Sequence, residues 1–172
     1  MASDEDILKE ARNALEEGNR EVGAKLFLAA ASRLATKMEY EKAAKIYEEG
    51  ALIYRDVYEA DECFKALDNA TLMLIRLPQG PEVYKEIVRI NKTAAKIAEE
   101  ATEYKKAADY YLRAQDFAVD EKEKVELSIK TADALEGNIA GFGENTVIVT
   151  PSFAKIHKEV HVHKEEKRSK FD

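Results

Sequence analysis

The sequence contains one cysteine, no tryptophan, three prolines and seven glycines among its 172 residues. A lone cysteine, Cys63, excludes an internal disulfide and fits a reducing compartment. Its neighbours Phe64 and Leu67 favour a small core residue over a reactive thiol. No apolar run approaches the roughly 18 residues that a bilayer span needs, and the acidic start lacks the features of a secretion signal. We therefore expect a cytoplasmic protein without membrane insertion.

Charged and apolar side chains are abundant, at 35% and 45% of the chain. Acidic residues exceed basic ones by 34 to 27, so the whole molecule should repel nucleic acid and anionic lipid. The length fits one domain built around one hydrophobic core. The composition therefore favours a helical domain and excludes nucleic acid as the expected partner.

A pattern of aromatic and small residues occurs twice, and we call it the small-large signature. Its copies are Tyr40-x-x-Ala43-x-x-x-Tyr47-x-x-Gly50 and Tyr104-x-x-Ala107-x-x-x-Tyr111-x-x-Ala114. In each copy the four residues share one helical face, so a neighbouring helix can approach closely while the rings fill the gaps. We therefore expect an all-α fold, an antiparallel stack of helix pairs with about seven helices. The copies lie three predicted helices apart, which leaves open an irregular array or a helix count that is off by one.

The predicted helix boundaries follow from capping and turn signals. Ser3 and Asp6 form a capping pattern that opens the first helix, and Gly18 closes it. The remaining helices are expected near residues 20–37, 40–55, 57–77, 82–100, 103–118 and 121–136. Residues 1–137 thus form a helical-repeat domain, and residues 138–172 form a tail.

The domain and the tail meet in a glycine-containing stretch, residues 137–143, that we interpret as a hinge because it lacks the lysine of a phosphate-binding loop. Residues 146–150 are strongly strand-prone and end at Pro151. An exposed apolar strand is unfavourable, so three arrangements stay open: docking on the helices, a β-hairpin with residues 156–162, or addition to another protein's sheet. Strand pairing through the tail is also a candidate route to a homo-oligomer.

Residues 22–31 and 39–47 resemble the helix pairs of tetratricopeptide proteins. They look most like the long-helix variant in soluble attachment proteins of the vesicle-fusion machinery, where runs such as Ala30-Ala31 alternate with Tyr or Phe. The resemblance covers about residues 20–137. It implies a superhelical stack with a groove that binds a peptide or helix of another protein. The Lys/Glu/His tail departs from the acidic, leucine-containing helix that ends those proteins.

The fifth predicted helix carries a basic stripe at positions i, i+4, i+7 and i+11, formed by Lys85, Arg89, Lys92 and Lys96. Tetratricopeptide grooves often use such a stripe to hold carboxylates, so the resemblance implies an acidic peptide as partner. The alternative is an ordinary solvated face that is balanced by nearby glutamates.

All three histidines, His157, His161 and His163, lie in the tail. In a strand they would share one face, and in a helix His157 and His161 would pair at i, i+4, so either geometry suits zinc or nickel. The alternative is a solvated tail, because structural zinc sites usually have four ligands. If a metal binds, the chain would be a metal- or ligand-responsive regulatory protein.

Catalytic chemistry would need a nucleophile beside a base, or two carboxylates forced into one apolar pocket. The sequence shows neither pattern, and residues 1–137 contain no histidine. We therefore expect a non-enzymatic adaptor or scaffold without a cofactor, with the tail histidines as the alternative functional site.

Overall fold

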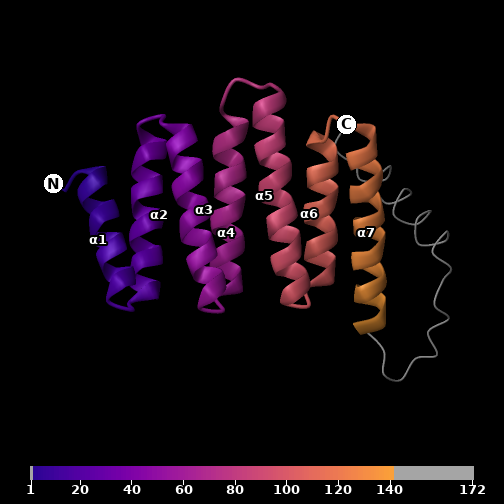
Figure 1. The fold of residues 1–172 in the computed structure, drawn as a ribbon, viewed down its shortest axis with the longest axis horizontal. Coiled ribbons are helices and arrows are strands. Elements are labelled where there is room, and N and C mark those ends of the chain that lie inside the picture. The colour runs from indigo at the N-terminus through magenta and orange to yellow at the C-terminus, as the bar shows by residue number, and fades with distance from the viewer. Residues whose placement is uncertain (1, 142–172) are drawn as a thin grey trace. The chain divides into compact units, whose positions relative to one another are not determined.

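The computed structural model describes residues 2–141, and this part of the chain is built from seven α-helices without a strand (Figure 1). The expected all-α class and helix count are therefore confirmed. The helices are α1 (Asp4–Glu16), α2 (Arg20–Thr36), α3 (Tyr40–Asp56), α4 (Ala60–Ile75), α5 (Pro81–Glu100), α6 (Tyr104–Phe117) and α7 (Glu121–Gly141). Across the described residues, no helix combines the length and apolar character needed to cross a membrane. The predicted strand at residues 146–150 lies outside them.

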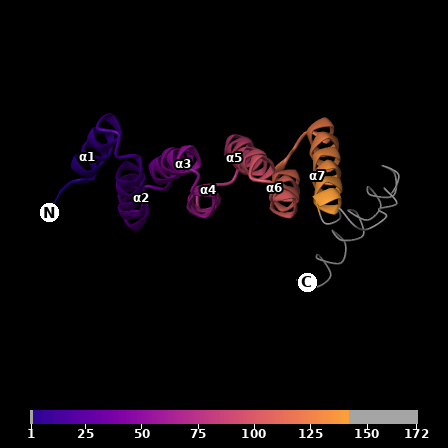
Figure 2. The ribbon, with the colours of Figure 1, turned by 90° about the horizontal axis from the view of Figure 1, so that it is seen from below.

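The chain divides into two compact units, the first ending at Ala94 and the second beginning at Ala95. The division falls inside α5. In the first unit, helices that follow one another are antiparallel neighbours, and α1 and α3 form one layer while α2 and α4 form the other (Figures 1 and 2). In the second unit, α6 packs against α7.

The N-terminus of α1 has the predicted capping box. Ser3 Oγ accepts a hydrogen bond from the Asp6 N–H at 3.1 Å, and the Asp6 carboxylate accepts one from the Ser3 N–H at 3.1 Å. Two of the free N–H groups that begin every helix are accounted for in this way. Asp4 also forms ion pairs with Lys37 at 2.6 Å and Arg33 at 3.1 Å, which join the start of α1 to the end of α2.

Four of the turns between helices share one backbone geometry, in which a residue with positive φ follows the helix end. That residue is Gly18, Met38, Tyr58 or Thr102, with φ of 83°, 63°, 62° and 57°. In each turn the next N–H bonds back to a carbonyl of the last helical turn, such as Glu59 N–H to the Tyr54 carbonyl at 2.9 Å. This is the Schellman arrangement, and it satisfies carbonyls that the helix leaves unpaired.

The turn at residues 57–59 corrects one sequence expectation, because the fourth helix was predicted to begin at residue 57 and instead begins at Ala60. That stretch has no glycine, asparagine or proline to mark a turn. Tyr58 instead adopts a left-handed conformation that a non-glycine residue enters only at a cost.

Replacing Tyr58 with glycine should stabilise the first unit by about 0.5–1 kcal/mol. The side chain is 94% exposed, so its removal sacrifices little packing while it relieves the left-handed backbone. Tyr58→Ala removes the same ring without relieving the backbone and should leave stability unchanged or lower. Urea unfolding followed by circular dichroism measures both. Equal stability of the two variants would contradict the assigned strain.

The small-large signature lies on α3 and α6, and in both copies its last three residues are buried while the first tyrosine is partly exposed. Ala43, Ala107 and Ala114 have no exposed surface, and Tyr111 is 1% exposed. The two copies lie three helices apart, on α3 and α6. In an array of helix pairs, one copy therefore falls on the first helix of a pair and the other on the second. Cys63 is also fully buried, and burial raises the pKa of its thiol to about 11. The predicted core position of this cysteine is therefore confirmed.

The C-terminal part of α7 corrects a second expectation. A hinge was predicted from residue 137 onward, but the helix continues to Gly141. A Cβ on Gly137 would lie 3.1 Å from the Tyr104 ring, so the glycine allows the ring to pack closely against α7. Gly137 therefore allows close packing of α7 against Tyr104, and it does not end the helix.

Candidate functional site

A groove lies in the first unit between α3 and the start of α5, and the end of α4 with its following turn forms the floor. Its volume is about 630 Å³. We call it the α3–α5 groove. It is lined by Glu41, Ala44, Lys45, Glu48, Leu74, Leu77, Pro78, Glu82, Val83, Glu86 and Ile90.

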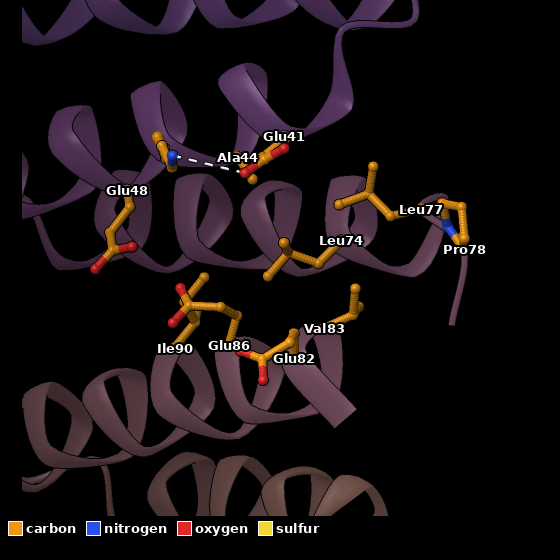
Figure 3. Close-up of a pocket in the computed structure, with 11 residues that line it drawn as sticks. Glu41, Ala44, Glu48, Leu74, Leu77, Pro78, Glu82, Val83, Glu86 and Ile90 are labelled. Atoms are coloured by element: carbon orange, nitrogen blue, oxygen red, sulfur yellow. Dashed lines mark ion pairs between the residues drawn. The ribbon is translucent and has the colours of Figure 1, made fainter. Parts of the chain in front are cut away.

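The floor of the α3–α5 groove is apolar and its rims are charged. Figure 3 shows Leu74, Leu77 and Val83 between Glu41 on one side and Glu82 on the other. Leu74 and Ile90 are 6% and 2% exposed, so they are largely covered by their own neighbours. Leu77 and Val83 are only partly buried, so they offer the apolar surface that a ligand can still cover.

The walls of the groove are fixed by hydrogen bonds and turn chemistry. Asn91 Nδ2 donates to Thr71 Oγ1 at 3.2 Å, a buried side-chain bond that joins α5 to α4. At the end of α4, the Gln79 amide donates to the Ile75 and Leu77 carbonyls at 2.8 and 2.7 Å. Pro81 then begins α5, at the first helical position, where an N–H would have no acceptor within the helix. The break that the sequence predicted at residues 77–81 thus shapes the floor of the groove.

Arg89 bridges the two rims of the groove. Its guanidinium donates to both carboxylate oxygens of Glu48 on α3, each at 2.7 Å, and to Glu86 on α5 at 2.9 and 3.3 Å. Two-pronged bonding of this kind is the strongest form of charge-assisted hydrogen bond between side chains. On the α3 rim, Lys45 forms a looser ion pair with Glu41 at 3.7 Å.

These contacts move the pKa values of two bridging groups, Glu86 and Arg89, further from neutrality. The hydrogen bond from Arg89 holds the pKa of Glu86 below its ordinary value of 4.5. Hydrogen bonds to Glu48 and Glu86 raise the pKa of the Arg89 guanidinium further above neutrality. Both shifts move the groups away from the range in which a side chain exchanges protons at pH 7.

The Arg89 bridge predicts a specific response to acid. Because the pKa of Glu86 is depressed in the folded protein, its stabilising contribution is present above the unfolded value and is lost as the pH falls through the folded value. Arg89→Met should therefore lose less stability than the wild type between about pH 5 and pH 3. Thermal unfolding midpoints across this range test the prediction. Lys65→Met, which removes a 3.5 Å ion pair to Glu62, is the control and should follow the wild-type profile.

The basic stripe predicted from the sequence lies on α5, and its four residues differ in exposure and in bonding. Arg89 is engaged with Glu48 and Glu86, whereas Lys85 and Lys96 are exposed and Lys92 is half-buried. None of the four is among the residues that line the α3–α5 groove. Recognition of an acidic peptide by this stripe stays a prediction. Because Arg89 is bonded to Glu48 and Glu86, the stripe would have to bind such a peptide mainly through its three lysines. His157, His161 and His163 lie outside the described residues, so the metal-site prediction also stays open.

A related hollow of about 500 Å³ repeats the arrangement one helix pair earlier, between α1, the end of α2 and α3. Three lysines and four acidic residues line it. Several of these are paired with each other, as Lys37 with Asp4 at 2.6 Å and Lys42 with Glu39 at 2.9 Å. The charges of this hollow are therefore closer to balance than those of the α3–α5 groove.

Sequence reasoning did not single out Glu41, Glu48 or Glu82 as site residues. Each is an ordinary surface glutamate when its own helix is considered alone, and only the packing of α3 beside α5 brings them to one groove. The i, i+7 spacing of Glu41 and Glu48 on one helical face was the available signal.

The sequence was compared with models of known protein families and with curated proteins. Neither comparison finds a match. The geometry of the α3–α5 groove and the charges around it are therefore the basis for a functional proposal.

Proposed function

We propose that the chain is a non-enzymatic adaptor or scaffold whose first unit binds a segment of another protein in the α3–α5 groove. The finer fold assignment in this proposal is a tetratricopeptide-like array in the long-helix form of the soluble attachment proteins. Helices of 16 or 17 residues in α2 to α4 and three-residue turns support it. The small-large signature supports close helix packing in both units.

The observation that carries this proposal is the combination of an apolar floor and charged rims in one groove. Leu77 and Val83 leave apolar surface partly uncovered, while the glutamates on both sides can orient a ligand by its charges. Binding sites typically combine apolar contact area with a few polar groups that set orientation. A groove open along two helices suits an extended or helical segment of another protein.

A catalytic role is less well supported by the same groove. General acid–base chemistry works best with a group whose pKa lies near the working pH. The groove carboxylate with a shifted pKa, Glu86, is moved down, and the pKa of Arg89 is moved up. These groups are suited to holding charge and orienting a partner.

Replacing Leu77 with glutamate should abolish partner binding while the protein stays folded. The variant removes apolar contact from the floor and adds a carboxylate, whereas the half-buried position tolerates the change better than a core site. A photo-crosslinking residue at Lys45, which lines the groove, should capture a partner from lysate of the source cells in the wild type and fail in Leu77→Glu. Circular dichroism checks that the variant is folded.

Two matched controls make this test specific. Leu72→Glu changes a residue of α4 that is 52% exposed and outside the groove, and it should preserve the crosslink. The crosslinker placed at Lys65, also on α4 and exposed, should capture no comparable product. Unchanged crosslinking in Leu77→Glu would rule out the groove as the binding surface.

A further inference from the structure

The four carboxylates of the α3–α5 groove outnumber its cations. Glu41 and Glu48 line it from α3, and Glu82 and Glu86 line it from α5. Only one lining residue, Lys45, is basic, and Arg89 adds a second cation through its bonds to the rims. Four carboxylates against two cations leave an excess of two negative charges around an apolar floor.

The excess is concentrated at the end of the groove away from Arg89. Arg89 occupies the Glu48 and Glu86 carboxylates at one end, with contacts of 2.7 and 2.9 Å. At the other end, Glu41 has only the 3.7 Å contact with Lys45. Glu82 has no ion-pair partner among residues 2–141. The partly exposed Leu77 and Val83 lie beside these two carboxylates (Figure 3).

The Arg89 bridge also shows which chemistry this groove accommodates. A guanidinium is already bound between its rims, in two-pronged contact with one wall and in contact with the other. A cationic side chain of a ligand would find comparable carboxylates at Glu41 and Glu82. An anionic ligand would meet uncompensated like charge at the same place, which disfavours it.

We infer that the α3–α5 groove receives a basic amphipathic segment of a partner protein. One large apolar side chain of that segment covers Leu77 and Val83, and Lys or Arg residues that flank it pair with Glu41 and Glu82. This inference rests on the proposed adaptor function and adds the charge of the ligand to it. The predicted ligand differs from the acidic peptide that the basic stripe implied.

Two synthetic peptides test the inference on the full chain. One consists of lysine and leucine, with leucines at helical i, i+4 spacing, and the other has glutamate in place of every lysine. Isothermal titration at near-physiological salt should give at least about tenfold tighter binding of the Lys/Leu peptide. Reversing two rim charges in Glu41→Lys/Glu82→Lys should weaken that binding by about tenfold or more.

A matched charge reversal separates groove binding from general attraction to an acidic protein. Asp61→Lys changes an exposed carboxylate in the first turn of α4, outside the groove, as Glu41 and Glu82 lie in the first turns of α3 and α5. It should alter the affinity by no more than about twofold, which is the effect of a distant screened charge. Its effect is compared with each single groove reversal, Glu41→Lys and Glu82→Lys, which change the net charge by the same two units. If the Asp61 reversal weakens binding as much as either of them, the inference is overturned.

The outcomes also distinguish this inference from the proposed function. Tighter binding of the Glu/Leu peptide, lost in Leu77→Glu, would preserve the groove as a docking site and overturn the basic ligand. If neither peptide binds in a Leu77-dependent manner, the basic ligand is again overturned, while crosslinking at Lys45 still decides the proposed function separately. Preference for the Lys/Leu peptide that needs Leu77, Glu41 and Glu82 supports both.

Discussion

Replacement of Tyr111 by alanine should lower the free energy of unfolding of the second unit by about 3–5 kcal/mol. Its side chain is 1% exposed within α6, and its loss leaves a cavity that rigid neighbouring helices fill only in part. Burial raises the pKa of the tyrosine, and the hydrogen bond from its hydroxyl to the Glu99 carboxylate raises it further. The Lys130 ammonium lies 5.8 Å from the ring centroid and ties α7 to the same ring.

One variant divides the Tyr111 contribution, and a second serves as a control. Tyr111→Phe keeps the ring and loses only the bond to Glu99, so it should cost about 1–2 kcal/mol. Val125→Ala removes methyl groups from a side chain that is 56% exposed and should change stability by less than about 0.5 kcal/mol. Chemical denaturation followed by circular dichroism compares all three. A cost below about 1 kcal/mol for Tyr111→Ala would mean that the ring is not a packing element.

Replacement of Gly50 by leucine should destabilise the first unit by about 1–3 kcal/mol, because the larger side chain strains the contact between α2 and α3. A Cβ at this position would lie 3.1 Å from Leu28 Cδ2 and 3.4 Å from Phe27 Cβ, so a larger side chain has no space between α2 and α3. Gly50→Ala adds one carbon against the flexible end of Leu28. Its gain in helix propensity offsets the tight contact, so stability should stay within about 1 kcal/mol of the wild type.

Gly80 provides the matched control for this overpacking experiment. No atom lies within 4 Å of a Cβ built there, because the residue is in the open turn before α5. Gly80→Leu should therefore remain within about 0.5 kcal/mol of the wild type. Equal destabilisation by leucine at both glycines would show that close helix contact is not what requires Gly50.

Most helix boundaries could be predicted because each carries a local signal. Ser3 caps α1 through its own side chain, and Pro81 begins α5 after a turn. The sequence placed the break between α3 and α4 at residue 56, whereas the turn lies at residues 57–59, because the left-handed backbone falls on Tyr58 and no glycine marks it. Gly137 was misleading for a related reason, since a glycine that ends many helices here makes room for the Tyr104 ring.

The candidate site was less accessible to sequence reasoning than the fold. The spacing on α5 correctly placed several basic residues on one helix, but it could not reveal that Arg89 is bound by Glu48, 41 positions away in the sequence. Charge pairing between helices depends on tertiary packing, which local periodicity does not encode. Glu41 and Glu82 likewise line one groove only because tertiary packing brings their two helices together.

Methyl NMR of the full chain, titrated with the Lys/Leu peptide, tests the central claim that the α3–α5 groove is a docking surface. Docking in the groove should shift the Leu77 and Val83 methyl signals, while those of Leu72 and Val125, which are exposed outside the groove, stay in place. Shifts confined to Leu72 or Val125, with the groove methyls unchanged at saturation, would contradict it.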